Sequence, residues 1–290
     1  MPLRRWNLAI TSFLMLLVSA DSPSLGGAQT SGLGLNPARL EVEVNPGGEK
    51  TVGFRIEAPA SGTPVAGRLM LTLTDWNMDE QANVSYAEPG TLPNSASPWI
   101  IFSPAAITTT SGETHLVRVT VRVPESAQPG VYRSGIFVQE RPPATPPNPG
   151  ERLLYFRFRY VFTLYVIVPP VAGHGELVDV RMVSDGEGVK LLYEMKNDGS
   201  RHIRPRVTWS IRGSDSREIV SGKNKETPVL LPYAAMNVRI PIAASLPSGE
   251  YQIEAHVDFN DGGSIQAVKR TIQLPVNLDK TASASNGSRK

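Results

Sequence analysis

The residue types that carry most enzyme and metal chemistry are few in this sequence, and they stand apart. Cysteine is absent, which excludes disulfides, thiolate metal sites and cysteine nucleophiles. The four histidines are scattered singly along the chain: His115, His174, His202 and His256. No nucleophile elbow, phosphate-binding glycine loop or pair of catalytic carboxylates is visible in the sequence. We therefore expect neither an enzyme nor a metal or cofactor site.

One short run carries oxygen-bearing side chains in the order of a calcium-binding loop. Asp258, Asn260 and Asp261 precede Gly262. Lys269 stands at the twelfth position, where such a loop carries a bidentate glutamate. Without that glutamate, the run has the composition of a hairpin turn. We interpret it as a turn between two strands.

The charge of the chain argues against nucleic acid as a partner. The chain has 290 residues, of which 29 are basic and 27 acidic, and its formal net charge is +2. The basic residues are spread along the chain, whereas proteins that follow nucleic-acid phosphates carry a concentrated basic stripe. We expect no nucleic-acid partner.

The N-terminus has the three-part layout of a secretory signal peptide. Arg4 and Arg5 precede an apolar run over residues 8–18, and small residues follow. The apolar run is shorter than the roughly 20 residues that span a bilayer, which favours a cleaved signal over a membrane anchor. The signal is expected to cover residues 1–28, with cleavage after Ala20 as the alternative. A periplasmic or secreted protein without a membrane span in its mature chain is predicted.

The mature sequence is dominated by short runs with a period of two. Leu40, Val42 and Val44, for example, alternate with charged residues. Proline and glycine turns separate such runs, and no helical stripe of ten or more residues is found. The pattern predicts an all-β protein.

The runs fall into two groups of the size of immunoglobulin-like β-sandwich domains. Two prolines at positions 169 and 170 separate them. We expect a first domain over residues 35–170, a second over residues 175–275, and a disordered polar tail over residues 277–290.

The strongest local feature is an alternation in which every even position from 154 to 168 is apolar or aromatic. It predicts a strand of about 15 residues, against a usual five or six. A segment with five prolines in ten residues, 141–150, precedes this strand. The first half of the strand carries the side chains of Leu154, Phe156, Phe158 and Tyr160.

An exposed sheet edge accepts a strand from another chain, because its amides and carbonyls are unpaired. We predict that the first half of the long strand is lent to a partner in this way, while the later residues pack in the home domain. The alternative is a strand that is wholly internal, with its even-numbered face in the core of its own domain.

Six stretches of the first domain stand in a defined order. They read PARLEV at residues 37–42, GGEKTV at 47–52, DW at 75–76, WIIFSP at 99–104, VRV at 117–119 and GVYR at 130–133. The proline-rich segment and the long strand follow. This ordered set resembles the periplasmic chaperones of the chaperone/usher pilus pathway, the PapD-like family. The second domain resembles a generic immunoglobulin-like module and shares with that family only this general type of fold.

The resemblance implies a chaperone that binds pilus or surface subunits, each a sandwich without its last strand, and that works with an outer-membrane usher. It implies that the long strand fills the groove of the subunit. Arg39 falls on the family's cleft arginine, which holds the terminal carboxylate of the subunit. Thr163 stands where the family has its cleft lysine.

Two functions from different classes fit the sequence. The first is a chaperone, or chaperone-like assembly factor, that caps subunits by lending a strand. The second is a structural or adhesive envelope protein whose two immunoglobulin-like domains bind a polymer or another envelope protein. A hydrolase, as a third possibility, would require a carboxylate pair or a histidine constellation that forms only in the folded protein.

Overall fold

The computed structural model describes residues 32–60, 67–140, 158–185, 188–224, 227–242 and 246–274. Most of these residues lie in β-strands, and the one helix among them is the short 3-10 helix η1 (Ser97–Trp99). The prediction of an all-β protein is therefore confirmed. No helix in the described ranges is long and apolar enough to cross a membrane.

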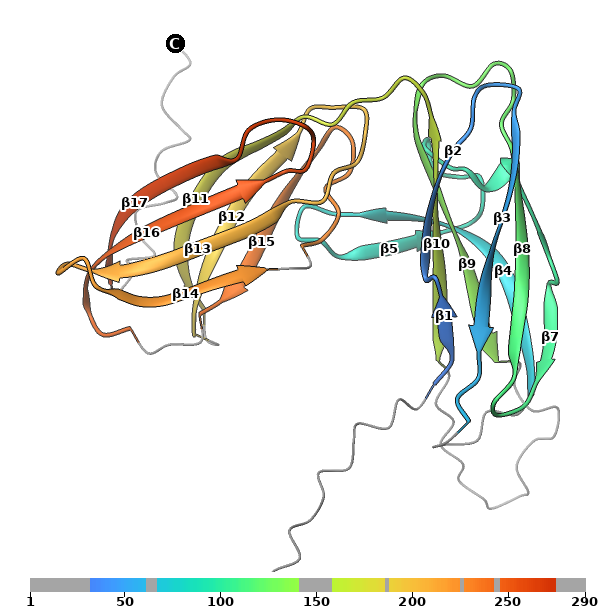
Figure 1. Ribbon diagram of the computed structural model, residues 1–290, viewed down its shortest axis with the longest axis horizontal. Helices are drawn as coiled ribbons and strands as arrows, with labels where there is room; N and C mark the ends of the chain where they lie inside the picture. Colours follow the sequence, from blue (N-terminus) through green and yellow to red (C-terminus); the bar gives the residue numbers. More distant parts are fainter. Residues whose placement is uncertain are drawn as a thin grey trace, which may run out of the picture.

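Strands β1 to β10 form the first sandwich, drawn in blue to yellow-green in Figure 1. They are β1 (Gly34–Asn36), β2 (Arg39–Glu43), β3 (Glu49–Glu57), β4 (Gly67–Met78), β5 (Val84–Ala87), β6 (Ile100–Ser103), β7 (Ala106–Thr109), β8 (Thr114–Arg122), β9 (Gly130–Glu140) and β10 (Arg159–Val168). One sheet has the order β1-β3-β8-β6. The other has the order β2-β10-β9-β4-β5, with β7 paired to the start of β4.

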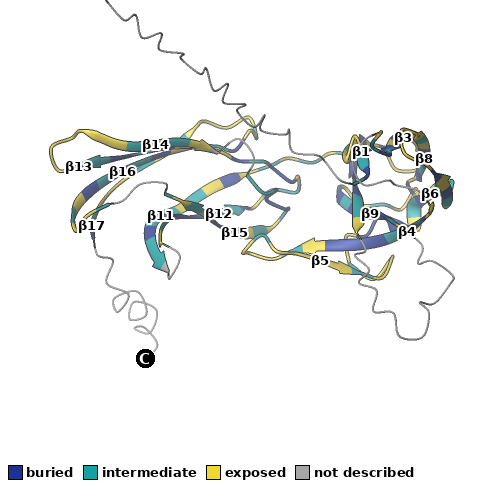
Figure 2. Cartoon of the chain, turned by 90° about the horizontal axis from the view of Figure 1, so that it is seen from below, coloured by how far each residue is buried: buried dark blue, intermediate teal, exposed yellow. Residues whose placement is uncertain are grey.

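The facing sides of these two sheets share one apolar core. Within it, Phe54 of β3 stacks on Phe162 of β10, with ring centroids 4.0 Å apart. Buried and exposed residues alternate along many of the strands, whereas β5 is largely exposed (Figure 2). This alternation is what a period of two produces when one face of a sheet packs on a core and the other meets water.

Strands β11 to β17 form the second sandwich, which makes a wide angle with the first (Figure 1). They are β11 (Gly175–Asp185), β12 (Gly188–Asn197), β13 (Arg206–Gly213), β14 (Glu218–Asn224), β15 (Ala234–Pro241), β16 (Gly249–Asp258) and β17 (Gln266–Leu274). Their sheets have the orders β11-β12-β15 and β14-β13-β16-β17. A separate core fills the space between them, with Tyr193, Ile211 and Ile253 fully buried.

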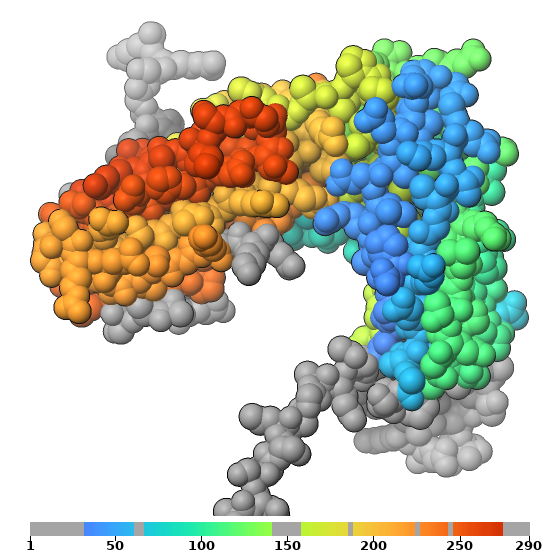
Figure 3. All heavy atoms as spheres, viewed as in Figure 1, coloured from blue at the N-terminus to red at the C-terminus, as the bar shows by residue number. Residues whose placement is uncertain are grey.

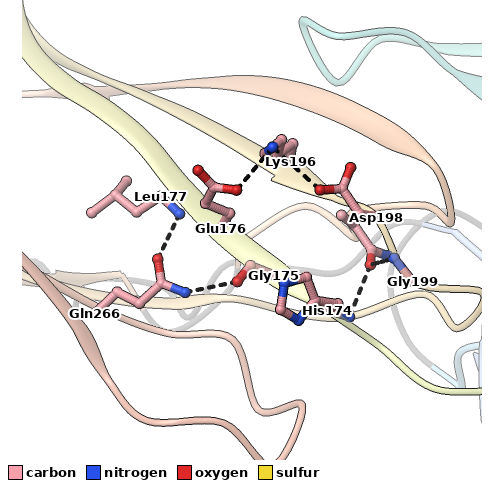
Figure 4. A network of polar contacts seen from close by, with 9 residues as sticks. His174, Gly175, Glu176, Leu177, Lys196, Asp198, Gly199 and Gln266 are labelled. Carbon is pink, nitrogen blue, oxygen red and sulfur yellow. Dashed lines mark hydrogen bonds and ion pairs between the residues drawn. The ribbon is translucent and has the colours of Figure 1, made fainter.

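Gln266 closes one side of the second sandwich, where the edge strands β11 and β17 approach each other. Its side-chain oxygen accepts a hydrogen bond from the amide of Leu177 at 2.8 Å, and its side-chain nitrogen donates to the carbonyl of Gly175 at 2.7 Å (Figure 4). The glutamine amide thus makes the two bonds that a peptide group of a neighbouring strand would make. The backbone amide of Leu177 and the carbonyl of Gly175, at the start of β11, therefore have hydrogen-bond partners within the chain.

Candidate partner-binding site

Strand β10 is covered by a neighbour along one side over its whole length and along the other side only in part. β9 pairs with it antiparallel from Arg159 to Val168. β2 pairs with it in parallel from Thr163 to Ile167, beginning with Thr163 opposite Arg39. The chain ahead of β2 has left this sheet, because β1 pairs with β3 in the other one. No described strand pairs with that side of β10 from Arg159 to Phe162.

The backbone groups that point toward this unpaired edge follow from one hydrogen bond. The amide of Thr163 donates to the carbonyl of Ala38 at 2.9 Å, so Thr163 directs its backbone polar groups toward the β2 side. Backbone polar groups alternate in direction along a strand, and only every second opposed pair in an antiparallel ladder is hydrogen-bonded. Arg159 and Val161 therefore direct their N–H and C=O groups toward the unpaired edge. The even-numbered residues between and after them bond to β9.

The even-numbered side chains change from exposed to buried along this segment. Phe158, directly before β10, is 61% exposed. Tyr160 is half-buried, and its hydroxyl accepts a hydrogen bond from the amide of Leu33 at 3.0 Å. Phe162, by contrast, is fully buried in the first core. Leu154 and Phe156, which the sequence adds to the same alternation, lie outside the described residues.

Arg39 is exposed and lies on the other face of the same sheet. It lines a cavity of about 730 Å³ to which both sandwiches contribute, and a space-filling view shows the hollow between the sandwiches (Figure 3). Val161 and Thr163 line this cavity from β10, and Arg204 and Arg206 line it from the second sandwich. We call this cavity the cleft.

A charged contact holds the two sandwiches together behind the cleft. Nε2 of His202 lies 2.9 Å from Oε1 of Glu41, and Nη2 of Arg204 lies 3.6 Å from the same oxygen. The hydrogen bond with His202 lowers the pKa of Glu41 to about 2, although burial acts in the opposite direction. Glu41 is therefore ionised at neutral pH and joins β2 to the second sandwich.

Aromatic and aliphatic side chains complete the contact between the sandwiches. Tyr165 of β10 stacks on the ring of His202, with centroids 4.3 Å apart, and Trp76 of β4 meets Tyr165 edge-on at 5.6 Å. Val229 and Leu231 pack into the same cluster from the second sandwich. Because the outer face of β10 is covered here, every residue from Leu164 to Val168 is buried.

The hairpin of β4 and β5 reaches from the first sandwich toward the second (Figure 1). Near its tip, the carbonyl of Glu80 accepts a hydrogen bond from the amide of Asn237 at 2.5 Å. Tyr86 of the same hairpin lines the cleft, and its ring meets that of Phe137 at 4.9 Å. The hairpin is thus both a wall of the cleft and a second bridge between the sandwiches.

Buried polar groups fix β4 below the cleft. The carboxylate of Asp75 accepts hydrogen bonds from the hydroxyls of Ser95 and Ser97, each at 2.6 Å, and from the amide of Leu92 at 3.0 Å. Burial disfavours ionisation of Asp75, but these hydrogen bonds together lower its pKa. The buried Arg133 donates to the carbonyl of Trp76 at 3.1 Å. These bonds hold Trp76 in place against Tyr165.

The residues predicted from the sequence fall on two faces of one strand pair. Arg39 lies beside Thr163 at the end of the unpaired edge, on the cleft side. Phe158 and Tyr160 belong to the opposite, even-numbered face. His202, Arg204 and Arg206 were not predicted as site residues from the sequence. The run RHIRPR at residues 201–206, with three arginines and a histidine in six positions, was the available signal.

The calcium-like run forms a turn. The side chain of Asp258 accepts a hydrogen bond from the amide of Asn260 at 2.8 Å, and Asp261 accepts one from the amide of Gly175 at 2.8 Å. In the part of the chain that the structure describes, no group of three or more histidine, aspartate or glutamate residues is placed to hold a metal ion.

No family model matches the chain, and no curated protein matches it. Several solved structures match the chain. The class 5 fimbriae chaperone CfaA has 8% identity and a TM-score of 0.41, covering 83% of this chain and 98% of its own. The CsuC–CsuE chaperone–subunit complex from archaic chaperone-usher Csu pili of Acinetobacter baumannii gives 14% identity and a TM-score of 0.44, over 82% and 97%. The E. coli chaperone DraB gives 14% and 0.37, over 83% and 97%. All three structures are of fimbrial chaperones or their complexes, with identities below 25% and TM-scores below 0.5.

Proposed function

We propose that this protein is a periplasmic chaperone-like assembly factor that caps a pilus or surface subunit by adding the segment around the start of β10 to the incomplete sheet of that subunit. One observation carries the proposal: the edge of β10 is unpaired from Arg159 to Phe162 and covered by β2 from Thr163 onward. Arg159 and Val161 offer their backbone groups at this edge, and unpaired groups of this kind are a template for a strand of another chain.

The side chains beside the edge suit such an addition. Phe158 exposes an aromatic ring that its own domain does not cover. Leu154 and Phe156 continue the same alternation in the sequence and belong to the proposal as further donor residues. Burying the three side chains of Leu154, Phe156 and Phe158 contributes about 4.5 to 9 kcal/mol, at about 1.5 to 3 kcal/mol each, whereas association costs about 4 to 15 kcal/mol. Hydrogen bonds along the edge must therefore contribute as well.

The position of β2 sets where a partner strand must end. A strand added along β10 cannot continue past Thr163, because β2 already occupies that side. Arg39 stands at this point. An arginine suits the capture of a carboxylate, since its planar group donates two parallel hydrogen bonds. In the proposal, the C-terminus of the subunit lies at Arg39, and its last strand runs parallel to β10.

The signal peptide predicted over residues 1–28 supports a periplasmic location for this function. There the chaperone would hold its subunit until an outer-membrane usher takes it over. The two-sandwich arrangement suits capture without catalysis: one sandwich offers the edge and the other completes the cleft at the end of that edge.

Two proline substitutions on neighbouring residues test the strand addition. Val161→Pro removes an N–H group that points to the unpaired edge, whereas Phe162→Pro removes one that bonds to β9. We expect Val161→Pro to melt within a few degrees of the wild type and to lose the subunit that the tagged wild type co-purifies from envelope extract. Phe162→Pro, the variant on the other side of the strand, is expected to unfold the domain, because it removes both a hydrogen bond to β9 and a ring buried in the core.

Amide exchange in the purified complex gives a second test. The amides of Arg159 and Val161 should exchange quickly in the free protein and become protected in the complex, while the amide of Tyr160 is protected in both. If Val161→Pro retains the subunit at wild-type affinity, the edge is not the binding element. A fixed binding surface, as in an adhesive protein, would then be the better explanation.

A further inference from the structure

We infer that the second sandwich supplies a binding residue for the terminal carboxylate of the partner, Arg204, which acts together with Arg39 across the cleft. The inference rests on the proposed strand addition, because that addition brings the end of a partner strand to the cleft.

The charge balance of the cleft is the first observation. Among its described lining residues are three arginines, Arg39, Arg204 and Arg206, and no aspartate or glutamate. Arg39 has no hydrogen bond or ion pair to any described side chain. Its neighbour on β10 is the neutral Thr163. Glu41 offsets part of the charge of Arg204 from behind the cleft, but the cleft lining itself carries only positive charge. Such an excess of positive charge in a concave, partly desolvated site favours an anionic ligand.

Arg204 is held in place on one side and open on the other. Its Nη2 atom is buried, lies 3.6 Å from Oε1 of Glu41 and has no hydrogen-bond partner. Its guanidinium group lies over the ring of Tyr165, 5.4 Å from the centroid. The side chain is 28% exposed and lines the cleft. A guanidinium has five N–H donors, so donors remain for a ligand after these contacts.

The position of the cleft favours a chain terminus as the source of the anion. Strands of a sheet lie about 4.8 Å apart, so a strand added beside Val161 reaches the line of β2 at Arg39. The covered edge from Thr163 onward stops the strand there. Its final carboxylate then lies within the cleft that Arg204 lines from the opposite sandwich. Arg206, which is exposed, lies farther along the same run and adds to the attractive field.

A short peptide with and without a terminal charge tests the inference. The probe is acetyl-Ser-Val-Thr-Val-Thr-Val as the free acid and as the C-terminal amide, titrated into the isotope-labelled mature chain. Amide shifts of Val161 and Thr163 report binding at the edge. We expect the acid to bind about tenfold more tightly than the amide, since a charge-assisted pair is lost in the amide.

Arg204→Gln should reduce the acid-to-amide ratio to about twofold to threefold, and Arg204→Lys should retain part of it. Arg118→Gln, an exposed arginine on β8, is the control and should leave the ratio unchanged. Thermal unfolding checks that the variants keep their fold.

The outcomes separate the two proposals. If the ratio stays at its wild-type value in Arg204→Gln, or if acid and amide weaken equally, the carboxylate role of Arg204 is wrong while strand addition stands. If neither peptide shifts Val161 and Thr163, strand addition itself fails. Inorganic phosphate is the last probe: binding as tight as that of the acid peptide would show a general anion site and overturn the assignment to a chain terminus.

Discussion

Thr163 of β10 lies directly opposite Arg39 of β2, and this pair marks the residue at which one side of β10 changes from unpaired to covered. Ahead of the pair, β10 has β9 as its one described neighbour. After Thr163, β10 lies between β2 and β9 and is buried on both faces. One strand therefore has a segment that is free to bind and a segment that anchors it.

Phe158 is expected to matter for partner binding and little for folding. Because its ring is 61% exposed, Phe158→Ala should change the free energy of unfolding by less than about 0.5 kcal/mol. Loss of its burial in the complex should weaken subunit binding by about 1.5 to 3 kcal/mol, and Phe158→Asp should weaken it further. Ile101→Ala, at an exposed residue of β6, is the matched control for both measurements. Equal losses of stability and binding in Phe158→Ala would show that the ring packs in its own domain.

The contact of Glu41 with His202 should make the protein less stable in acid. The pKa of Glu41 is about 2 in the folded protein, chiefly through the hydrogen bond with His202, against 4.5 as its ordinary value. A lowered folded-state pKa stabilises the protein above pH 4.5, and this contribution is lost as the pH falls toward 2. Because the carboxylate is partly exposed, solvent screening reduces the effect to about 1 to 2 kcal/mol.

Urea unfolding between pH 6 and pH 2.5 measures this dependence. Glu41→Gln should flatten it, whereas Glu49→Gln, which removes an exposed partner of Arg122, should leave it nearly unchanged. An unaltered pH dependence in Glu41→Gln would mean that another carboxylate is responsible.

Asp75→Asn is expected to destabilise the first sandwich by about 2 to 3 kcal/mol. The carboxylate is fully buried and accepts hydrogen bonds from Ser95, Ser97 and Leu92. An amide offers one oxygen in place of two and leaves buried donors unsatisfied. Chemical unfolding measures the loss. Asp79→Asn, at an exposed aspartate that accepts bonds within a turn, should cost less than about 1 kcal/mol; equal costs at both positions would contradict the explanation.

Gln266→Leu is expected to destabilise the second sandwich by about 2 kcal/mol, because it removes two hydrogen bonds between β11 and β17. Gln273→Leu, at an exposed position of the same strand, should be nearly neutral. Unfolding curves of the two variants provide the comparison. A neutral Gln266→Leu would show that the packing of β11 against β17 does not depend on the glutamine amide.

Local patterns in the sequence predict most of the strands and which of their faces are apolar. Val42, Val44, Phe162 and Leu164 could be assigned to a core face, because alternation along a strand is a local property with a period of two. The turn at Asp258 could likewise be read from a few neighbouring residues.

The position of the unpaired edge of β10 and the surroundings of Arg39 depend on how the strands and sheets come together in the folded protein. The unpaired edge exists because β1 joins the opposite sheet and β2 begins at Arg39, and strand neighbours of this kind are not encoded in local periodicity. Glu41 and His202 are 161 positions apart in the chain and meet through the docking of two separately packed sandwiches. Arg204 reaches the cleft by the same docking. A pattern that repeats every second residue fixes which way a side chain points within its own strand, but contacts between distant strands depend on how whole sheets pack against each other.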